Sequence, residues 1–352
     1  MCKRITVKIG SNVLTRKDGT LDVTRMSALV DQIVELNRRG VEVVIVSSGA
    51  VASGRSELRS ASSALDAVSA RQLFSAVGQT KLMNRYFDLF RGNGRICGQV
   101  LTTKEFFSTR MHYRNQKRCM DVMLANGVVP IVNENDTISL TELMFTDNDE
   151  LSGLVAKMMC SDKLIILSNI DGIFDGDPAD SRSRVIREVF PETANLKDCI
   201  KSTKSQFGRG GMLTKCAIAR HIAEEGIEVV IANGKTENIL LRLLEDPAGT
   251  LSTRFVANAN AVPAPGNPAK RVIVIRADVA QNLKTGTPTS IFSDDVLDVS
   301  GEFFRDEVVR VNTPDGTQIG VGKALCSSEE VGRLLGAPER QKVIHYDYLF
   351  LD

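Results

Sequence analysis

Hydrophobic residues at the start of the chain follow first the period of a strand and then that of a helix. Ile5, Val7 and Ile9 alternate with polar residues, which predicts a strand. Residues 22–38 place apolar side chains at helical spacing, and Gly40 ends this helix. The next run is made mainly of β-branched residues and predicts a buried strand at 41–46.

The same alternation continues to about residue 245. Further helices are predicted at 69–90, 113–126, 149–160 and 212–225, and further strands at 96–101, 128–132, 163–168 and 228–232. Strands and helices in alternation are typical of a doubly wound α/β domain. Ligands bind beyond the carboxyl ends of the strands in such sheets, so we expect the functional residues there.

The alternation stops at Ala257–Lys270, a segment rich in Ala, Asn and Pro that predicts an interdomain linker. The short β-like runs beyond it are Val272–Ile275, Glu307–Val311, Gln318–Val321 and Lys342–His345. Pro314-Asp315-Gly316 predicts a turn between two of them. We therefore expect one domain at 1–256, a linker at 257–270 and a small, mostly β domain at 271–352.

Composition and charge narrow the class of protein. Apolar residues make up 43% of the 352 and aromatic residues only 5%, so the core must be mainly aliphatic, as suits a buried parallel sheet. The net charge is +1, and residues 263–352 carry 10 Lys and Arg against 13 Asp and Glu, a balance of −3. Neither part attracts nucleic acid or anionic membranes by charge alone, so we expect no membrane partner and no RNA partner.

Cysteine and histidine usage favours a cytoplasmic protein. The seven cysteines form no C-x-x-C pair, which fits reduced thiols better than a disulfide framework. The three histidines are far apart in sequence, which disfavours a zinc site. The first ten residues lack the apolar stretch of a signal peptide, and no apolar run approaches the length of a membrane span.

Two small-residue turns follow the first two predicted strands. In Lys8-Ile9-Gly10-Ser11, the glycine lets the backbone approach an anion and the lysine can touch a phosphate, although lysine at a strand end is more often a solvated residue. In Ser47-Ser48-Gly49-Ala50, hydroxyl and N–H groups can hold phosphate or carboxylate. The alternative for the second turn is an ordinary strand-to-helix connection with serine as N-cap.

Two polar segments follow the strand at 128–132. Asn133-Glu134-Asn135-Asp136 supplies amides and carboxylates that favour an ammonium-bearing ligand, although a loop with an Asx turn has the same composition. Asp147-Asn148-Asp149-Glu150 precedes an amphipathic helix, where acidic residues are common in any first turn. One of these carboxylates can also hold a lysine or a metal.

A glycine-rich turn, Gly208-Arg209-Gly210-Gly211, opens the helix that contains Lys215. Glycines admit phosphate to the backbone, and a helix N-terminus favours an anion. The pattern is not a P-loop, since Gly-Lys-Ser/Thr is absent, and the protein-kinase signatures are absent as well. Residues 168–174 follow a strand and can line a nucleotide pocket or form a simple Asp-Gly turn.

The order of these motifs closely resembles that of the glutamate 5-kinase family in the amino acid kinase superfamily. The matching motifs, spread over residues 3–256, are V-K-I-G-S, V-S-S-G-A, I-N-E-N-D, T-D-N-D-E-L-S, D-G-I-F-D-G-D-P and G-R-G-G-M-L-T-K. The tail resembles the PUA domain of the same family, through Gly301–Phe304, Glu307–Val311 and Val343–His345. It departs from that pattern over 271–300, and Asn169 stands where the family has Asp.

The resemblance implies a three-layer αβα sandwich with a mostly parallel sheet for residues 1–256. Lys8 and Lys215 would stabilise the transferring phosphoryl group, with Asp149 holding both lysines in place. The residues implied for glutamate binding are Ser48, Gly49, Asp136 and Asn148. Those implied for ATP binding are Ser168, Asn169, Gly208, Gly210, Gly211, Met212 and Lys215. Mg²⁺ would be held mainly through the ATP phosphates, without a metal site of the protein's own.

The implied reaction converts ATP and L-glutamate to ADP and L-glutamyl 5-phosphate, the first step of proline biosynthesis. Proline would be a feedback inhibitor, and the protein a dimer or tetramer built through the kinase domain. The reaction suits the residues, because the attacking carboxylate is already ionised at neutral pH and no general base is required. The alternatives are a sister kinase acting on aspartate, N-acetylglutamate or carbamate, an RNA-binding protein, and a regulatory paralogue without activity.

Overall fold

The chain folds into two compact units, Met1–Val262 and Pro263–Asp352. The computed structural model describes every residue except 1, 59–64, 104–105, 108–109, 139–147, 178–179, 191–211, 260, 262–270, 286–288, 302, 304, 306, 339 and 352, together with the side chains of 110, 111 and 284. Three glycines of the predicted ATP site, Gly208, Gly210 and Gly211, lie outside the described residues, as does most of the expected linker.

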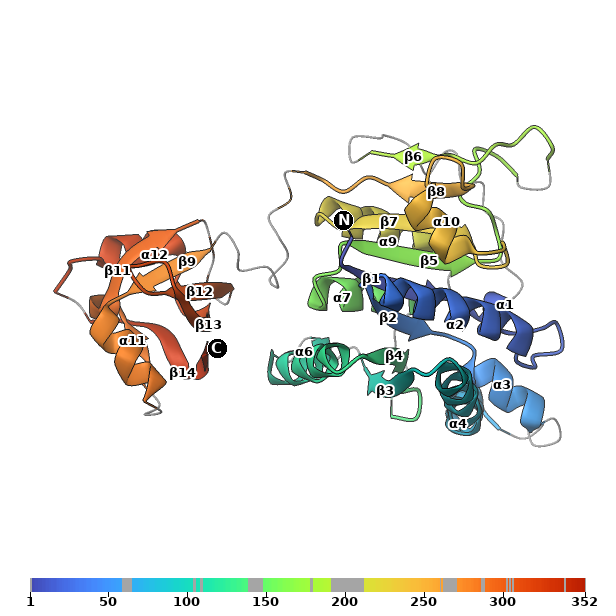
Figure 1. The fold of residues 1–352 in the computed structure, drawn as a ribbon, viewed down its shortest axis with the longest axis horizontal. Coiled ribbons are helices and arrows are strands. Elements are labelled where there is room, and N and C mark those ends of the chain that lie inside the picture. Colours follow the sequence, from blue (N-terminus) through green and yellow to red (C-terminus); the bar gives the residue numbers. More distant parts are fainter. Residues whose placement is uncertain are drawn as a thin grey trace. The chain divides into compact units, whose positions relative to one another are not determined.

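The first unit is built on an eight-stranded sheet in the order β3-β4-β2-β1-β5-β7-β8-β6 (Figure 1). The strands are β1 (Arg4–Ile9), β2 (Glu42–Ser47), β3 (Ile96–Thr102), β4 (Val128–Glu134), β5 (Lys163–Ser168), β6 (Glu188–Val189), β7 (Glu228–Asn233) and β8 (Ser252–Phe255). The first six strands in this order, β3-β4-β2-β1-β5-β7, are parallel to one another. Strand β8 pairs antiparallel with β7, and β6 pairs with β8 at the edge of the sheet. The mostly parallel sheet predicted from the sequence is therefore confirmed.

Helices cover both faces of this sheet and make it the middle of three layers (Figure 1). They are α1 (Ser11–Leu14), α2 (Val23–Arg38), α3 (Ala50–Glu57), α4 (Ala67–Gly92), α6 (Arg110–Ala125), α7 (Asn148–Met158), α9 (Met212–Glu224) and α10 (Ile239–Glu245). Val43 and Ile45 of β2 share a core with α2, α4 and α10, whereas Val44 and Val46 share one with α6 and α7. Successive strand residues point to opposite faces, so one uninterrupted apolar strand serves both cores.

The second unit is a six-stranded sheet in the order β10-β14-β13-β12-β9-β11. Its elements are β9 (Val272–Ile275), α11 (Ala277–Lys284), β10 (Ile291–Phe292), the 3₁₀ turn η2 (Ser293–Asp295), β11 (Val296–Ser300), β12 (Val308–Asn312), β13 (Gln318–Ala324), α12 (Ser328–Leu334) and β14 (Lys342–Leu351). It has a hydrophobic core of its own that includes Ile273, Val309 and Phe303. The strand-rich tail is thus confirmed, with two helices that the β-like runs did not predict.

Among the described residues, no helix is both long and apolar enough to cross a membrane.

The helices at 23–38 and 67–92 begin where side chains cap them. Asp22 accepts a hydrogen bond from the backbone N–H of Arg25, and Asp66 accepts from those of Val68 and Ser69. These caps satisfy backbone donors that the first turn of a helix leaves unpaired.

Candidate active site

Two lysines from distant parts of the chain meet on one buried carboxylate. Lys8 Nζ lies 2.6 Å from Asp149 Oδ1, and Lys215 Nζ lies 2.6 Å from Asp149 Oδ2. The Asp149 side chain is 0% exposed, and those of Lys8 and Lys215 are 4% and 12% exposed. Two ammonium groups gathered on one carboxylate and largely shielded from water can act strongly on an anion.

The sheet brings these three residues together at the carboxyl ends of its central strands. Lys8 is the penultimate residue of β1, which lies between β2 and β5, while Asp149 and Lys215 stand in the first turns of α7 and α9. Two sequence-based alternatives are therefore wrong. Lys8 is buried rather than solvated, and Asp149 forms ion pairs with two lysines in addition to standing in the first turn of a helix.

Gly10 lets the chain turn closely past the end of β1. Its backbone N–H donates to the carbonyl oxygen of Leu167, 3.1 Å away. A Cβ atom at this position would lie 3.1 Å from the same oxygen and 3.7 Å from Lys8 Nζ. A larger residue would therefore crowd both the neighbouring strand and the lysine, which explains the glycine in this turn.

Asn148, next to Asp149 in the chain, forms hydrogen bonds with the ends of two strands, β2 and β4. Its Nδ2 donates to the carbonyl oxygen of Ser47 at 3.0 Å, to Ser48 Oγ at 3.1 Å and to Asn133 Oδ1 at 2.9 Å. Asn133 in turn donates to Gln79 Oε1 at 2.8 Å. The predicted substrate residues Ser48 and Asn148 are thus in direct contact, through an amide whose donors are fully used.

Gly49 and Tyr86 shape the same turn. Gly49 has φ 103° and precedes α3, a left-handed conformation that favours glycine. Beneath it, the hydroxyls of Ser47 and Tyr86 lie 3.0 Å apart. Burial raises the pKa of Tyr86 well above its ordinary value, so this phenol is neutral and serves as a structural support for Ser47.

The predicted substrate residue Asp136 has a partner that the sequence analysis missed. Arg71 of α4 approaches Asp136 Oδ1 with Nε at 2.8 Å and an Nη atom at 2.7 Å, and approaches Glu134 Oε2 at 3.3 Å. The two carboxylate side chains are only 6% and 3% exposed. No motif marked Arg71, because an arginine on an amphipathic helix usually belongs to its solvated face.

The structure describes four of the predicted ATP residues, namely Ser168, Asn169, Met212 and Lys215. Ser168 ends β5 and is buried, Asn169 is exposed, and Met212 is the first residue of α9. The segment after Ser168 is held by the loop that follows β7. Gly234 N–H donates to the Ser168 carbonyl at 2.8 Å, and Asn233 Nδ2 donates to Asp171 Oδ1 at 2.9 Å.

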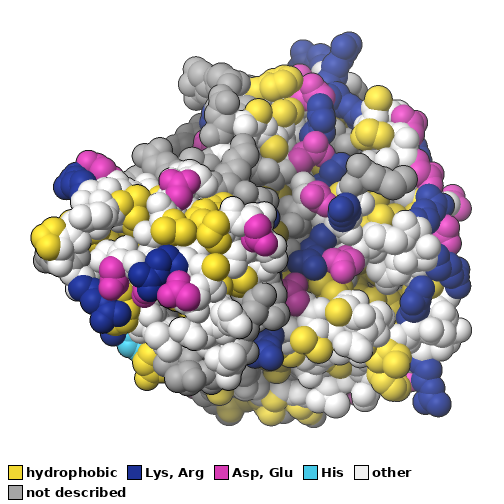
Figure 2. Space-filling view, turned by 60° about the vertical axis from the view of Figure 1, so that its left-hand side comes forward, with side chains coloured by type: hydrophobic (Ala, Val, Ile, Leu, Met, Phe, Trp, Pro, Cys, Tyr) yellow, Lys and Arg dark blue, Asp and Glu magenta, His cyan; other side chains and the backbone are white. Residues whose placement is uncertain are grey.

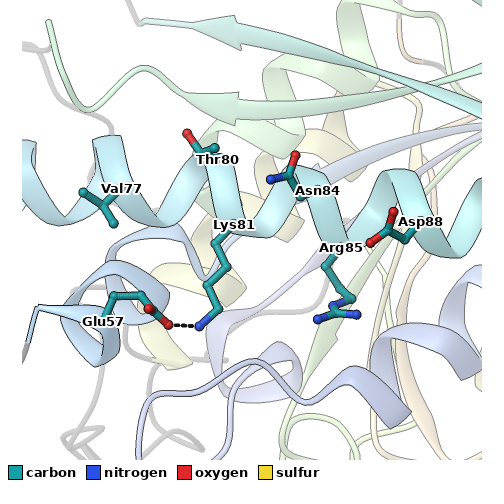
Figure 3. Close-up of a pocket in the computed structure, with 7 residues that line it drawn as sticks. All are labelled: Glu57, Val77, Thr80, Lys81, Asn84, Arg85 and Asp88. Carbon is teal, nitrogen blue, oxygen red and sulfur yellow. Dashed lines mark hydrogen bonds and ion pairs between the residues drawn. The ribbon is translucent and has the colours of Figure 1, made fainter.

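Two surface pockets of the described residues lie apart from the residues of this site. One, of about 290 Å³, is lined by one face of α4 and by Glu57, which is ion-paired with Lys81 (Figure 3). Another, of about 490 Å³, lies between α2 and the start of α10. On the face drawn in Figure 2, acidic and basic side chains of the described residues are interspersed rather than gathered by sign.

Comparison with known families gives two matches along the chain. Residues 3–233 match the amino acid kinase family, and residues 271–344 match the PUA domain. Among solved structures, UMP kinase from Bacillus anthracis superposes with a TM-score of 0.51 at 16% identity, covering 73% of this chain and 97% of that one. This structural likeness supports the fold of the first unit.

Curated relatives align along almost the entire chain. A glutamate 5-kinase from Bacteroides thetaiotaomicron is 56% identical over 99% of this chain and 98% of its own length. Glutamate 5-kinase from Chlorobaculum tepidum is 42% identical over 99% and 97%, and glutamate 5-kinase 2 from Bacillus subtilis is 34% identical over 97% and 92%. The chain therefore belongs to the amino acid kinase family and, within it, to the glutamate 5-kinases, with a PUA domain at its C-terminal end.

Proposed function

We propose that this protein transfers the γ-phosphoryl group of ATP to the side-chain carboxylate of L-glutamate, which forms ADP and L-glutamyl 5-phosphate, the first step of proline biosynthesis. The observation that carries this proposal is the buried Lys8–Asp149–Lys215 cluster. It supplies positive charge at one point and no general base. That combination matches an acceptor that is already ionised at neutral pH.

Phosphoryl transfer places negative charge on the oxygens of the group in flight. Lys8 and Lys215 are proposed to stabilise that charge, and Asp149 to hold both ammonium groups before ATP arrives. Positioning charge in advance avoids reorganisation at the moment of reaction and is commonly the largest contribution to such catalysis.

Glutamate is proposed to bind beside this cluster, at the ends of β2 and β4. Ser48 Oγ and the backbone at Gly49 can receive a carboxylate, and the carboxylate of Asp136 can receive the ammonium group. Asn148 connects the two sides through its contacts with Ser48 and Asn133. The acceptor would therefore meet neutral hydrogen-bond donors at a carboxylate and a negative charge at its ammonium group.

ATP is proposed to lie along Ser168, Asn169 and the N-terminus of α9, with Gly208, Gly210, Gly211 and Met212 against its phosphates. A helix N-terminus favours phosphate through unpaired N–H groups and the helix dipole. Mg²⁺ is proposed to enter with ATP, held mainly by the ATP phosphates, where it would offset their negative charge.

The deciding experiment measures ADP release with Mg²⁺ and ATP in the presence of hydroxylamine, which traps an acyl phosphate as a hydroxamate. Glutamate, aspartate, N-acetylglutamate and a blank without acceptor are compared. Hydroxamate with glutamate alone is the expected result. Turnover with another acceptor would move the protein to a sister activity. The absence of turnover from folded protein would favour a regulatory paralogue.

The protein is also proposed to work as a homo-oligomer in the cytoplasm. Large apolar side chains stand exposed along α4, β3 and α6, including Phe87 at 47%, Ile96 at 61% and Val122 at 54%. Exposed apolar residues close to an edge strand favour association between copies. Light scattering after size exclusion would give the mass, with a dimer or tetramer expected.

Proline is proposed as a feedback inhibitor, because it shares the ammonium and α-carboxylate of the acceptor. Inhibition that glutamate relieves is the expected result.

RNA is proposed not to be a partner of the second unit, although Lys323 lies over the ring of Tyr348, 5.6 Å from its centroid, and Arg340 lies over that of Phe292 at 4.1 Å. Retention of structured RNA on a filter by this unit would contradict that expectation.

A further inference from the structure

Helix α4 reaches the proposed acceptor site through two polar side chains. Arg71 contacts Asp136 and Glu134, and Gln79, about two turns further along, accepts a hydrogen bond from Asn133. All three partners belong to the segment at the end of β4. The helix therefore acts on the same loop at two points, in addition to packing Leu82, Tyr86 and Phe90 into the core.

The contact of Arg71 offsets the repulsion between two carboxylates in that loop. Asp136 and Glu134 are two residues apart, and their side chains are 6% and 3% exposed. Two nearly buried carboxylates repel each other and lose hydration, which is costly without a cation. A guanidinium group offers several N–H donors in a fixed plane and can serve both carboxylates at once.

Both of the short contacts from Arg71 reach Oδ1 of Asp136. A planar guanidinium group held at this oxygen fixes the direction in which the carboxylate faces, and so the arrangement that it offers to an arriving ammonium group.

The position of Arg71 is fixed by a close helix crossing. A Cβ atom at Gly78 of α4 would lie 1.8 Å from the carbonyl oxygen of Ala50, and one at Gly54 of α3 would lie 1.8 Å from that of Phe74. The two backbones thus touch directly. Since α3 begins immediately after Gly49, α4 is held in register with the turn that contains Ser48.

We propose that Arg71 is a positioning residue for acceptor recognition, which holds the carboxylates of Asp136 and Glu134 in the arrangement that receives the ammonium group of the amino-acid substrate. This inference rests on the proposed function. Arg71 acts through these carboxylates, so it should influence the affinity for glutamate more than the chemical step or the binding of ATP.

The test compares Arg71→Met and Arg71→Lys with Arg85→Met in the hydroxamate assay. Arg85 lies about four turns further along the same helix, where it lines the pocket drawn in Figure 3. For Arg71→Met, we expect the KM for glutamate to rise about 10- to 100-fold, with kcat and the KM for ATP within about threefold of wild type. Arg71→Lys should recover part of the loss, because it keeps the charge but not the planar fork. Arg85→Met should match wild type.

The outcomes separate this inference from the proposed function. Wild-type turnover of glutamate decides the function by itself. If wild type is active and Arg71→Met keeps its KM for glutamate, or loses kcat and both KM values alike, the positioning role is wrong and the function stands. If the Arg71→Met variant does not fold, Arg71→Lys decides the question. An unchanged KM for glutamate in Arg71→Lys would then overturn the positioning role of Arg71. If wild type uses another acceptor, the same comparison is made with that acceptor, and if it uses none, the inference fails with the function.

Discussion

Lys8 Nζ lies 2.6 Å from Asp149 Oδ1 although the side chains are only 4% and 0% exposed. Charges are seldom buried to this degree, because each loses its hydration. The second contact of Asp149, with Lys215, places two ammonium groups on this one carboxylate. Two ammonium groups gathered in this way suit the proposed site for a phosphoryl anion.

Replacing Asp149 with Asn should slow the reaction without removing the binding groups. The amide keeps the shape of the carboxylate but cannot offer oxygen to both lysines, so one ammonium group loses its partner. We expect kcat to fall about 100- to 1,000-fold, with smaller changes in KM. Glu57→Gln is the matched control, since the Glu57–Lys81 pair is exposed and its loss should leave kcat within about twofold (Figure 3). Equal kcat values for the two variants would contradict the assigned role.

Replacing Asn148 with Ala should weaken acceptor binding and destabilise the fold. The amide serves three acceptors, among them Ser48 Oγ and Asn133 Oδ1. We expect the free energy of unfolding to fall by about 1–3 kcal/mol and the KM for glutamate to rise at least about tenfold. In the control, Asn126→Ala, the lost hydrogen bond is local and exposed, to Val122 in α6 at 2.8 Å. Denaturation curves and initial rates of both variants give the comparison.

The crossing of α3 and α4 should tolerate no extra methyl group. Gly78→Ala would place Cβ 1.8 Å from the backbone oxygen of Ala50, which a rotamer change cannot relieve. We expect a loss of about 2–5 kcal/mol in the free energy of unfolding. Gly92, near the end of the same helix, has nothing within 4 Å of the added Cβ. Gly92→Ala should therefore be neutral or stabilising by up to about 1 kcal/mol, and equal melting curves for the two variants would refute the crossing.

Cys216, the neighbour of Lys215, should be inert in the folded protein. Burial raises the pKa of this thiol from 9.0 to about 12, against the smaller lowering effect of Lys215. Iodoacetamide at pH 8 should label the exposed Cys119 while sparing Cys216, and mass spectrometry distinguishes the two. Between pH 9 and about 12 the folded chain holds a proton that the unfolded chain releases, so this group's contribution to stability is present below pH 9 and is lost as the pH rises through that window. Labelling of Cys216 at the rate of Cys119 would disprove the burial.

Local periodicity was sufficient to predict the long helices of the first unit and all of its strands except β6 and β8. The predicted strand at 163–168 and the helix expected at 22–38 agree with β5 and α2 to within one residue. It was not sufficient for α3, whose sequence of small and polar residues has no clear apolar stripe. That helix forms where it does because Gly54 allows its backbone to lie against α4. Such a contact depends on a partner outside the segment itself.

The sequence by itself determined which residue types follow each strand, and the order of the motifs identified their family. Only the tertiary structure decided which of those residues meet. Asp149 and Lys215 are 66 residues apart, and Asn148 and Ser48 are 100 apart. Their contacts depend on the strand order β4-β2-β1-β5, which arises from packing of the entire sheet. Arg71 shows the limit most clearly, because its helical spacing is that of an ordinary surface residue and only the fold places two buried carboxylates beside it.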